Sequence, residues 1–302
     1  MGGLELAELD VSRNWGFVTA VEQERLNATK VAVAGAGGDG GLVAEHLARL
    51  GVRRFALADP EIFEPENANR QNGCDVSTFG RNKAEVIGDI IKRINPAAEV
   101  SIYPHGIAVD NIDEFVDGAG LVVDETEYTR PQLSLMIARA ARPRRIPVVS
   151  GVNVGFGAMV TTFLPGRMTL ERYLGLPSDI SIEDASTVDL PLRRWVVRLP
   201  SYGEESGLRL IATGAVPAPS VAPGVALASG LVVTEAFNAI TGRRQPVTAP
   251  RTLYFDALER KMRVVRLRGL AYYSSLVHLL VRSRLGLNPV MTPPAVVGTS
   301  HD

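Results

Sequence analysis

Short apolar runs alternate with longer amphipathic stretches over the first half of the chain. Runs of about four apolar residues predict buried strands, and stretches with an apolar residue at every third or fourth position predict helices. The predicted strands cover residues 31–34, 55–58, 100–103 and 121–123. The predicted helices cover residues 19–27, 42–50, 83–94 and 111–116. This alternation indicates an α/β fold, in which helices flank a mostly parallel, Rossmann-like sheet.

The second half of the chain adds segments that extend such a sheet with antiparallel strands. Residues 165–222 are rich in Pro and Gly and predict a long irregular loop. The basic cluster at residues 142–145 is expected to be a solvated helix end. The other predicted elements are a helix at 131–141, strands at 147–150 and 157–164, a helix at 223–240, a hairpin at 251–256 and 262–267, and a tail helix at 271–285.

A glycine-rich turn joins the first of these strands to the helix that follows it. The turn contains Gly35, Gly37, Gly38 and Gly40, and Asp59 follows the second strand. Glycines let the backbone approach a phosphate, a helix start offers unpaired N–H groups, and an acid at this point accepts hydrogen bonds from ribose hydroxyls. The layout predicts a nucleotide-binding site, and alone it is typical of an NAD-dependent oxidoreductase.

The loop after Asp59 favours chemistry at the phosphates over hydride transfer. Residues 59–71 are dense in acids and amides and contain Arg70, and Lys83 begins the next predicted helix. A carboxylate that attacks an α-phosphate brings two negative charges together. At about 4 Å these repel by about 1 kcal/mol in water and by about 4 kcal/mol at an effective dielectric constant of about 20. A site that excludes water must supply positive charge, and Arg70 and Lys83 are placed to do so.

These segments resemble the ubiquitin-activating-enzyme-like superfamily of ThiF/MoeB/HesA adenylyltransferases. The motifs of that family read here as Gly35 to Gly40, Asp59, the loop Asn67 to Gln71, Lys83, and the segment Asp124 to Glu127. The resemblance covers about residues 13–242. It implies an ATP- and Mg2+-dependent enzyme that activates the carboxylate of a small protein or peptide as an acyl-adenylate, and it implies a homodimer.

The resemblance also implies roles for individual residues. Arg70, Lys83 and Glu127 are expected to be catalytic, and Glu127 with Asp124 to bind the metal. Glutamate stands at position 127, where the family usually has aspartate. The expected nucleotide-binding residues are Gly35, Gly37, Gly38, Gly40, Asp59, Glu61, Glu66, Asn67, Asn69, Arg70, Gln71, Lys83, Asp124, Tyr128 and Arg13, the last reaching the ATP of the partner subunit.

Within this resemblance we expect one continuous domain with three parts. Residues 1–28 form an N-terminal arm and helix, and residues 29–165 form the nucleotide-binding half. Residues 166–302 hold a crossover loop that covers the substrate's tail, the substrate and dimerisation half, and a C-terminal tail.

The composition is that of an ordinary soluble globule. Of the 302 residues 46% are hydrophobic and 22% are charged, and the net charge of −1 gives no reason to expect a nucleic-acid or membrane partner. No apolar stretch is expected to approach the roughly 20 residues that cross a bilayer. The single cysteine excludes an internal disulfide and the four-cysteine zinc site of many ThiF/MoeB proteins, and it fits a cytoplasmic protein.

Two residues in the motifs need separate interpretation. Asp39 lies inside the phosphate-binding turn, and we expect it to be a solvated acid that points away from the nucleotide. Cys74 lies near Arg70 and Asp75, where a lowered thiol pKa is one interpretation and a packing role is the favoured one. No cysteine occurs where ubiquitin-type members form a thioester. We therefore expect an external nucleophile to attack the adenylate directly.

Three alternatives stay open at this point. The chain is alternatively a tRNA-modifying dehydratase of the same superfamily, an NAD(P)-dependent oxidoreductase, or a degenerate nucleotide-binding partner subunit. The acceptor is equally open, between a protein's C-terminus, a peptide in a natural-product pathway and a sulfur carrier.

Overall fold

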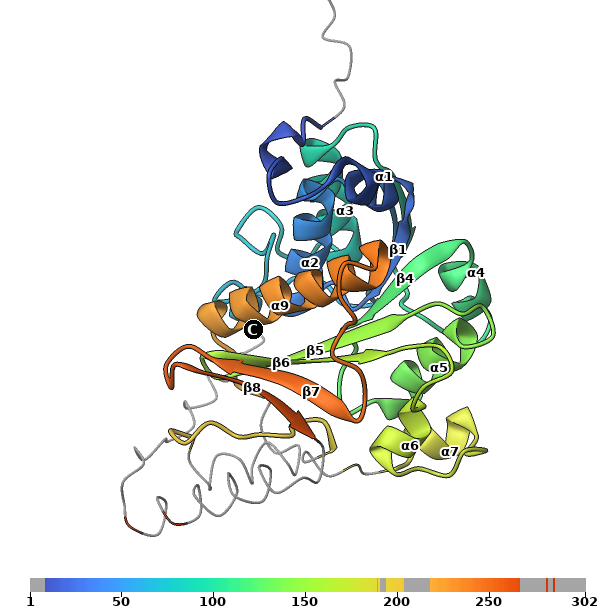
Figure 1. Ribbon diagram of the computed structural model, residues 1–302, viewed down its shortest axis with the longest axis vertical. Helices are drawn as coiled ribbons and strands as arrows, with labels where there is room; N and C mark the ends of the chain where they lie inside the picture. Colours follow the sequence, from blue (N-terminus) through green and yellow to red (C-terminus); the bar gives the residue numbers. More distant parts are fainter. Residues whose placement is uncertain are drawn as a thin grey trace, which may run out of the picture.

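A single eight-stranded sheet forms the centre of the protein in this computed structural model, which describes residues 9–188, 190, 194–203, 218–266, 281 and 285 (Figure 1). The strand order is β3-β2-β1-β4-β5-β6-β7-β8. The first five strands in this order pair in parallel and the last three join antiparallel. The strands are β1 (Lys30–Ala34), β2 (Arg54–Ala58), β3 (Glu99–Tyr103), β4 (Ala119–Asp124), β5 (Val148–Val154), β6 (Gly157–Phe163), β7 (Arg251–Asp256) and β8 (Lys261–Arg266). This confirms the predicted fold class.

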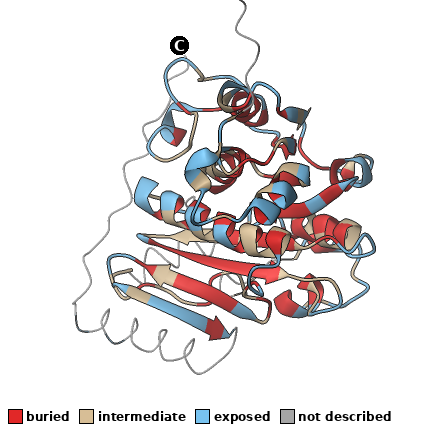
Figure 2. Cartoon of the chain, turned by 45° about the horizontal axis from the view of Figure 1, so that its top comes forward, coloured by how far each residue is buried: buried red, intermediate tan, exposed pale blue. Residues whose placement is uncertain are grey.

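Helices cover both faces of the sheet. The helices are α1 (Ala20–Ala28), α2 (Gly38–Arg49), α3 (Lys83–Ile94), α4 (Ile112–Val116), α5 (Pro131–Ala141), α6 (Leu170–Leu174), α7 (Ile182–Ser186) and α9 (Ala222–Thr241), with 3-10 turns η1 (Ser12–Asn14) and η2 (Pro65–Asn67). Helices α1, α2, α3 and α9 pack with the sheet face that carries Val31 and Val33. Helices α4 and α5 pack with the opposite face, which carries Ala32 and Ala34. Figure 2 shows the buried residues concentrated on the strands and on the helix sides that face them.

The order of the strands reverses at β1 and β4. The chain passes from β1 to β2 on one side and later inserts β4 on the other side of β1. Ligands of open parallel sheets bind where the strand order reverses in this way, outside the carboxyl ends of the strands. The segments that follow β1, β2 and β4 are the three that carry the predicted site residues.

Helix α9 departs from the expectation that no stretch reaches the length of a membrane span. Its 20 residues, Ala222–Thr241, are long and apolar enough by length and composition alone. Half of the most apolar stretch is buried inside the protein, where Val232 and Ala236 join the core between α2 and the sheet. A buried core helix explains this composition.

The stretch at residues 165–222 is less irregular than expected. It contains α6 and α7, each capped by a hydroxyl side chain, from Thr169 and Ser181. Residues 142–145 are exposed at the end of α5, as expected of a solvated helix end. In addition, Arg142 and Arg139 both pair with the buried Glu171 of α6, at 2.6 and 3.0 Å. A buried carboxylate needs such partners, which the sequence pattern did not predict.

The segment 194–203 lies against the antiparallel end of the sheet. Val196 and Val197 are buried with Met159 of β6 and Tyr254 of β7. The Tyr202 hydroxyl donates to Asp256 Oδ2 at 2.9 Å and accepts from the Phe156 N–H at 2.7 Å. The predicted tail helix at 271–285 lies outside the described residues, apart from residues 281 and 285.

Candidate functional site: a nucleotide-binding crevice

Two glycines of the turn between β1 and α2, Gly35 and Gly40, are packed so tightly that a side chain cannot replace them. Gly35 has φ of +88°, and a Cβ placed on it would lie 2.3 Å from the Glu125 carbonyl oxygen. A Cβ on Gly40 would lie 1.9 Å from the Gly35 carbonyl oxygen. Such distances are far below van der Waals contact, so the close approach of β1, α2 and the end of β4 depends on glycine.

Asp59 ties the glycine turn to the loop after β2. The Ala36 N–H donates to Asp59 Oδ2 at 2.7 Å, and the Glu61 N–H donates to Oδ1 at 2.9 Å. Burial raises the pKa of Asp59, while these two hydrogen bonds and the charge of Lys83 oppose the rise. Asp59 directly follows β2, at the carboxyl edge of the parallel strands, and its role towards the ribose stays a prediction.

Lys83 and Glu61 form an ion pair next to Asp59. Lys83 Nζ lies 2.6 Å from Glu61 Oε2. Asn82 caps α3 and positions this lysine, because its side-chain amide donates to the Asp59 and Glu61 carbonyls, at 2.8 and 3.2 Å. Partial desolvation and the negative charge of Glu61 raise the pKa of Glu127, against the attraction of Arg130 and Lys83. The structure therefore brings Asp59, Glu61, Lys83 and Glu127 together.

Arg70 is directed at its own loop. Its Nη1 donates to the Asn69 Oδ1 at 2.8 Å and to the Glu66 carbonyl at 3.0 Å. Asn69 also donates to the Ser220 carbonyl, at 3.4 Å. Asn67 is buried and its Oδ1 accepts the Glu64 N–H at 3.1 Å, so this amide shapes the loop. The roles of Arg70, Asn67 and Asn69 towards phosphates stay predictions.

Gln71 lies over the start of α2. Its amide is 3.6 to 3.7 Å from the position of a Cβ on Gly37. Gln71 Oε1 is shielded from solvent and accepts no hydrogen bond from any residue that the structure describes. This places an unpaired acceptor beside the turn that is predicted to hold phosphates.

The expectation for Asp39 is wrong. The side chain is buried rather than solvated, with 8% of its surface exposed. Asp39 Oδ2 accepts hydrogen bonds from the side chain and the backbone of Asn153 at the end of β5, at 2.8 and 3.3 Å. Burial raises the pKa of Asp39 to about 6, against the hydrogen bonds from Asn153 and the positive charge of Arg70.

Glu125 is a neighbour of Asp39 that the sequence analysis missed. It accepts the Gly151 N–H at 3.1 Å. Burial and the negative charges of Asp39 and Asp124 raise the pKa of Glu125 well above its usual range. Alternation along β4 was the available signal, because consecutive residues of a strand point to opposite faces and Glu125 follows Asp124.

Asp124 and Tyr128 lie on the other side of this strand end. Asp124 is buried, and its Oδ1 accepts from the Thr126 hydroxyl at 2.7 Å. Burial raises the pKa of Asp124, and burial together with the charge of Glu127 raises the pKa of Tyr128. In the described part of the chain, no group of three His, Cys, Asp or Glu side chains could hold a metal ion by itself. The donors present fit an ion that one carboxylate and the nucleotide's phosphates share, which is the usual manner of Mg2+.

Cys74 has the environment of a packing residue. It is buried with Phe63 and Val86, and its thiol lies 3.5 Å from the Glu64 carbonyl. Burial raises the pKa of the thiol, which opposes formation of a reactive thiolate. Arg13 is exposed in η1, and its predicted contact with a partner's nucleotide stays a prediction.

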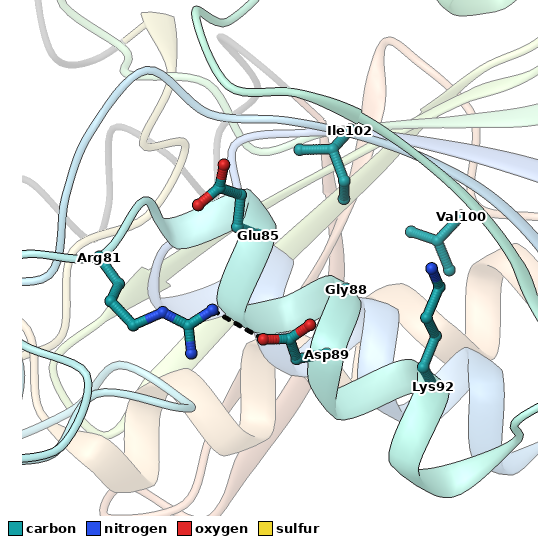
Figure 3. A pocket seen from close by; sticks show the side chains of 7 residues that line it. All are labelled: Arg81, Glu85, Gly88, Asp89, Lys92, Val100 and Ile102. Atoms are coloured by element: carbon teal, nitrogen blue, oxygen red, sulfur yellow. Dashed lines mark hydrogen bonds and ion pairs between the residues drawn. The ribbon is translucent and has the colours of Figure 1, made fainter.

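A separate cavity of about 220 Å³ lies between α3 and the edge strand β3 (Figure 3). It is lined by Arg81, Glu85, Gly88, Asp89, Lys92, Val100 and Ile102. Two of the lining residues, Arg81 and Asp89, form an ion pair at 2.7 Å (Figure 3). No predicted site residue lines it, so we do not assign it to the nucleotide site.

Comparison with known proteins identifies the family. The model of the ThiF family matches residues 10–271, which is most of the chain. The chain belongs to the ThiF family. Members of this superfamily include adenylyltransferases of the MOCS3 type.

Curated relatives of this ThiF family member match over part of their length. The maize "Adenylyltransferase and sulfurtransferase MOCS3-1" is 28% identical over 82% of this chain and 46% of its own length. The "SAMP-activating enzyme E1" of Haloferax volcanii is 33% identical over 47% of this chain and 52% of its own. The "tRNA threonylcarbamoyladenosine dehydratase" of Escherichia coli is 32% identical over 41% of this chain and 46% of its own. The chain thus spans about half the length of these relatives.

Solved structures share the fold. E. coli MccB in complex with ATP aligns with a TM-score of 0.62 at 20% identity, over 82% of this chain and 66% of MccB. PaaA aligns with a TM-score of 0.59 at 20% identity, over 83% of this chain and 67% of PaaA. At this identity the likeness establishes the α/β architecture.

Proposed function

We propose that this chain activates a carboxylate as an acyl-adenylate, using ATP and releasing pyrophosphate. The observation that carries the proposal is the convergence of Asp59, Glu61, Lys83 and Glu127 beside the glycine turn, at the carboxyl edge of a parallel sheet. Membership of the ThiF family and the likeness to adenylyltransferases support it. The substrate carboxylate belongs to a small protein or peptide.

In this mechanism the substrate carboxylate attacks the α-phosphorus, and the bond from that phosphorus to the pyrophosphate oxygen breaks. Asp59 accepts hydrogen bonds from the ribose, and the N–H groups at the start of α2 bind phosphate oxygens. Lys83 and Arg70 offset the negative charge that develops at the α-phosphorus. Arg70 reaches the phosphate by exchanging its contacts with Asn69 and the Glu66 carbonyl for the nucleotide.

Mg2+ is the metal that this reaction implies. Glu127 would hold it together with phosphate oxygens, and Asp124 would contribute if its hydrogen bond to Thr126 opened. The ion would offset charge on the departing pyrophosphate. No covalent enzyme intermediate is included, because Cys74 is buried with a raised thiol pKa.

A homodimer belongs to the same proposal. Arg13 lies beside two large apolar side chains that are almost fully exposed, Trp15 at 87% and Phe17 at 82%. Exposed apolar groups of this size favour burial against a partner surface. Light scattering of the purified protein decides the oligomeric state, and a monomer at micromolar concentration would contradict this part.

The test is exchange of labelled pyrophosphate into ATP in the presence of candidate carboxylates, such as synthetic peptides with free C-termini. Arg70→Ala and Lys83→Ala should each lower the exchange rate by about 100- to 1,000-fold, the usual effect of losing one charge-stabilising donor. Arg81→Ala is the matched control, because Arg81 pairs with Asp89 at the separate cavity. Unchanged exchange in Arg70→Ala would contradict the role assigned to it.

A tRNA-modifying dehydratase is the second candidate. The identities of 32% and 34% to curated dehydratases of E. coli and Bacillus subtilis favour it. Such an enzyme would activate a carboxylate on a nucleoside, so ATP consumption would depend on tRNA. Stimulation of AMP formation by total tRNA, with none by peptides, would select this candidate.

A further inference from the structure

Two acids from different motif segments meet below the glycine turn. Asp39 is the second residue of α2, and Glu125 follows the last residue of β4. Both acids are held against β5, where Asp39 Oδ2 accepts from the Asn153 side chain at 2.8 Å and Glu125 Oε1 accepts from the Gly151 N–H at 3.1 Å. Glu125 also packs against α2, because a Cβ on Gly40, the neighbour of Asp39 in sequence, would lie 3.2 Å from Glu125 Cβ. Neither acid can offset the charge of a triphosphate. Their presence inside a phosphate-binding site therefore needs another explanation.

Among the described residues, the groups that face this pair are mostly acidic or neutral. Arg70 acts on Asp39, while Asp124 adds a further negative charge near Glu125. Asn153 of β5 and Ser229 of α9 face Asp39 with neutral groups, the latter donating to the Asp39 carbonyl at 3.1 Å. In the proposed reaction Arg70 turns to the nucleotide. The acid pair then loses the positive charge of Arg70 at the moment when the bound phosphates add negative charge.

Two buried acceptor oxygens near the glycine turn have no hydrogen-bond partner among the described residues. Asp39 Oδ1 is shielded from solvent and accepts no hydrogen bond among the described residues, and the same holds for Gln71 Oε1. A buried acceptor without a partner costs free energy unless a ligand supplies a donor. Asp39 is more than nine-tenths buried, so a ligand has to displace a neighbour to reach it. Gln71 lies over the turn without a side-chain hydrogen bond in the described part, so it is the neighbour held least firmly.

We propose that Asp39 binds the acceptor as an ammonium group and takes its proton, so that the acceptor is a primary amine. This inference rests on the proposed adenylation. An ammonium group supplies both a positive charge and the N–H donor that the buried Asp39 Oδ1 lacks among the described residues. A thiolate or persulfide acceptor is an anion at neutral pH and is repelled by the Asp39 carboxylate.

The chemical step balances as follows. The ammonium group gives one proton to the Asp39 carboxylate, and the freed nitrogen lone pair attacks the acyl carbon of the adenylate. The new C–N bond forms, and the bond from that carbon to the phosphate oxygen breaks. AMP leaves with that electron pair, the nitrogen loses its second proton to water, and the product is an amide.

The test compares two nucleophiles on Asp39→Asn. Once a peptide that supports pyrophosphate exchange is in hand, ethylamine serves as the amine probe and hydroxylamine, which is largely uncharged near neutral pH, as a probe that needs no base. Asp39→Asn should lower amide formation with ethylamine by about 100-fold. Capture by hydroxylamine and pyrophosphate exchange should fall by less than about tenfold. Asp89→Asn, the same change at the separate cavity, should leave every rate unchanged.

A pH profile separates a chemical role from a structural one. Ethylamide formation by the wild type should rise as Asp39 ionises, and this limb should disappear in Asp39→Asn. Equal losses with both nucleophiles, or hydrosulfide reacting faster than ethylamine, would overturn the inference and leave the adenylation standing.

Absence of exchange with any carboxylate would instead overturn the proposed function. The amine site at Asp39 is then tested by the binding of ethylammonium in the presence of a non-hydrolysable ATP analogue, measured by saturation-transfer NMR. Wild type should bind this probe at least tenfold more tightly than Asp39→Asn, and equal binding would overturn the inference.

Discussion

Lys83 Nζ lies 2.6 Å from Glu61 Oε2, in a pair whose lysine side chain is 4% exposed and whose glutamate side chain is 53% exposed. The buried cation thus depends on a partner that is open to solvent. An incoming nucleotide can replace Glu61 without a change in the backbone of α3. The arrangement keeps the lysine paired before the phosphates arrive.

Glu61→Gln is therefore expected to destabilise the fold more than Lys83→Met does. The glutamine leaves a buried ammonium group without its counter-ion and should lower the free energy of unfolding by about 1–2 kcal/mol, a value reduced by the exposure of Glu61. Methionine removes the charge and fills the same space, so its cost should be smaller. Urea denaturation measures both. Asp89→Asn, at a pair exposed on both sides, should change stability by less than about 0.5 kcal/mol. A larger loss in Lys83→Met would refute this account.

Gly40→Ala is expected to disrupt the nucleotide site. Its Cβ would lie 1.9 Å from the Gly35 carbonyl oxygen, so the turn between β1 and α2 must move. We expect a loss of about 1–3 kcal/mol in unfolding free energy together with loss of ATP binding. Gly230→Ala is the matched control, because nothing lies within 4 Å of its Cβ in the exposed middle of α9. That change should stabilise the protein by about 0.5–1 kcal/mol. Normal ATP affinity in Gly40→Ala would contradict the packing argument.

Local sequence patterns predicted the helices and strands well where the hydrophobic periodicity and the capping residues indicated the same boundaries. Thr19 and Glu22 form a capping box at the start of α1, which matches the helix predicted at residues 19–27. Asn82 caps α3 and Asn95 ends it, close to the predicted boundaries. The hairpin of β7 and β8 forms as predicted and joins the main sheet at its edge. Such features depend on a few neighbouring residues, which a sequence displays directly.

Contacts between residues far apart in the sequence could not be predicted from local patterns. Asp39 and Asn153 are 114 residues apart, and their hydrogen bond exists only because β5 ends beside α2. Glu171 is held by arginines about 30 residues earlier in the chain. Arg70 lies in the loop where the sequence has it, but its direction depends on Asn69 and on a carbonyl that the pattern does not specify. Pattern reasoning assigned the predicted site residues to their segments, and tertiary packing decides their partners.

Nucleotide preference separates the proposed function from an oxidoreductase. ATP with Mg2+ should raise the unfolding temperature, because a ligand at 100 times its Kd stabilises by about 2.7 kcal/mol. NAD should give no comparable shift. Glu127→Gln should reduce the part of the shift that depends on Mg2+ and retain the part seen in EDTA. Differential scanning fluorimetry measures all of these. A larger shift with NAD than with ATP would reverse the assignment.

Asp39 should make the protein less stable as the pH rises. Its pKa is raised from 3.8 to about 6 by burial, so the folded state binds more protons than the unfolded state between these values. The stability that the protonated form provides is therefore complete below about pH 4 and is lost as the pH rises through about 6. Asp39→Asn removes this loss and should raise the free energy of unfolding by on the order of 2 kcal/mol at about pH 7, with little effect at about pH 4.

Asp75 provides the control for that prediction, because its contribution to the free energy of unfolding changes with pH in the opposite direction. Hydrogen bonds from Ser77 lower the pKa of Asp75, so its contribution is present at neutral pH and is lost on acidification. Asp75→Asn should therefore leave the protein slightly less stable at neutral pH. Urea denaturation at several pH values measures both variants against the wild type. Equal destabilisation by Asp39→Asn at every pH would contradict the prediction. The carboxyl group would then be a structural hydrogen-bond acceptor, and it would not carry the stability cost expected of a functional acid.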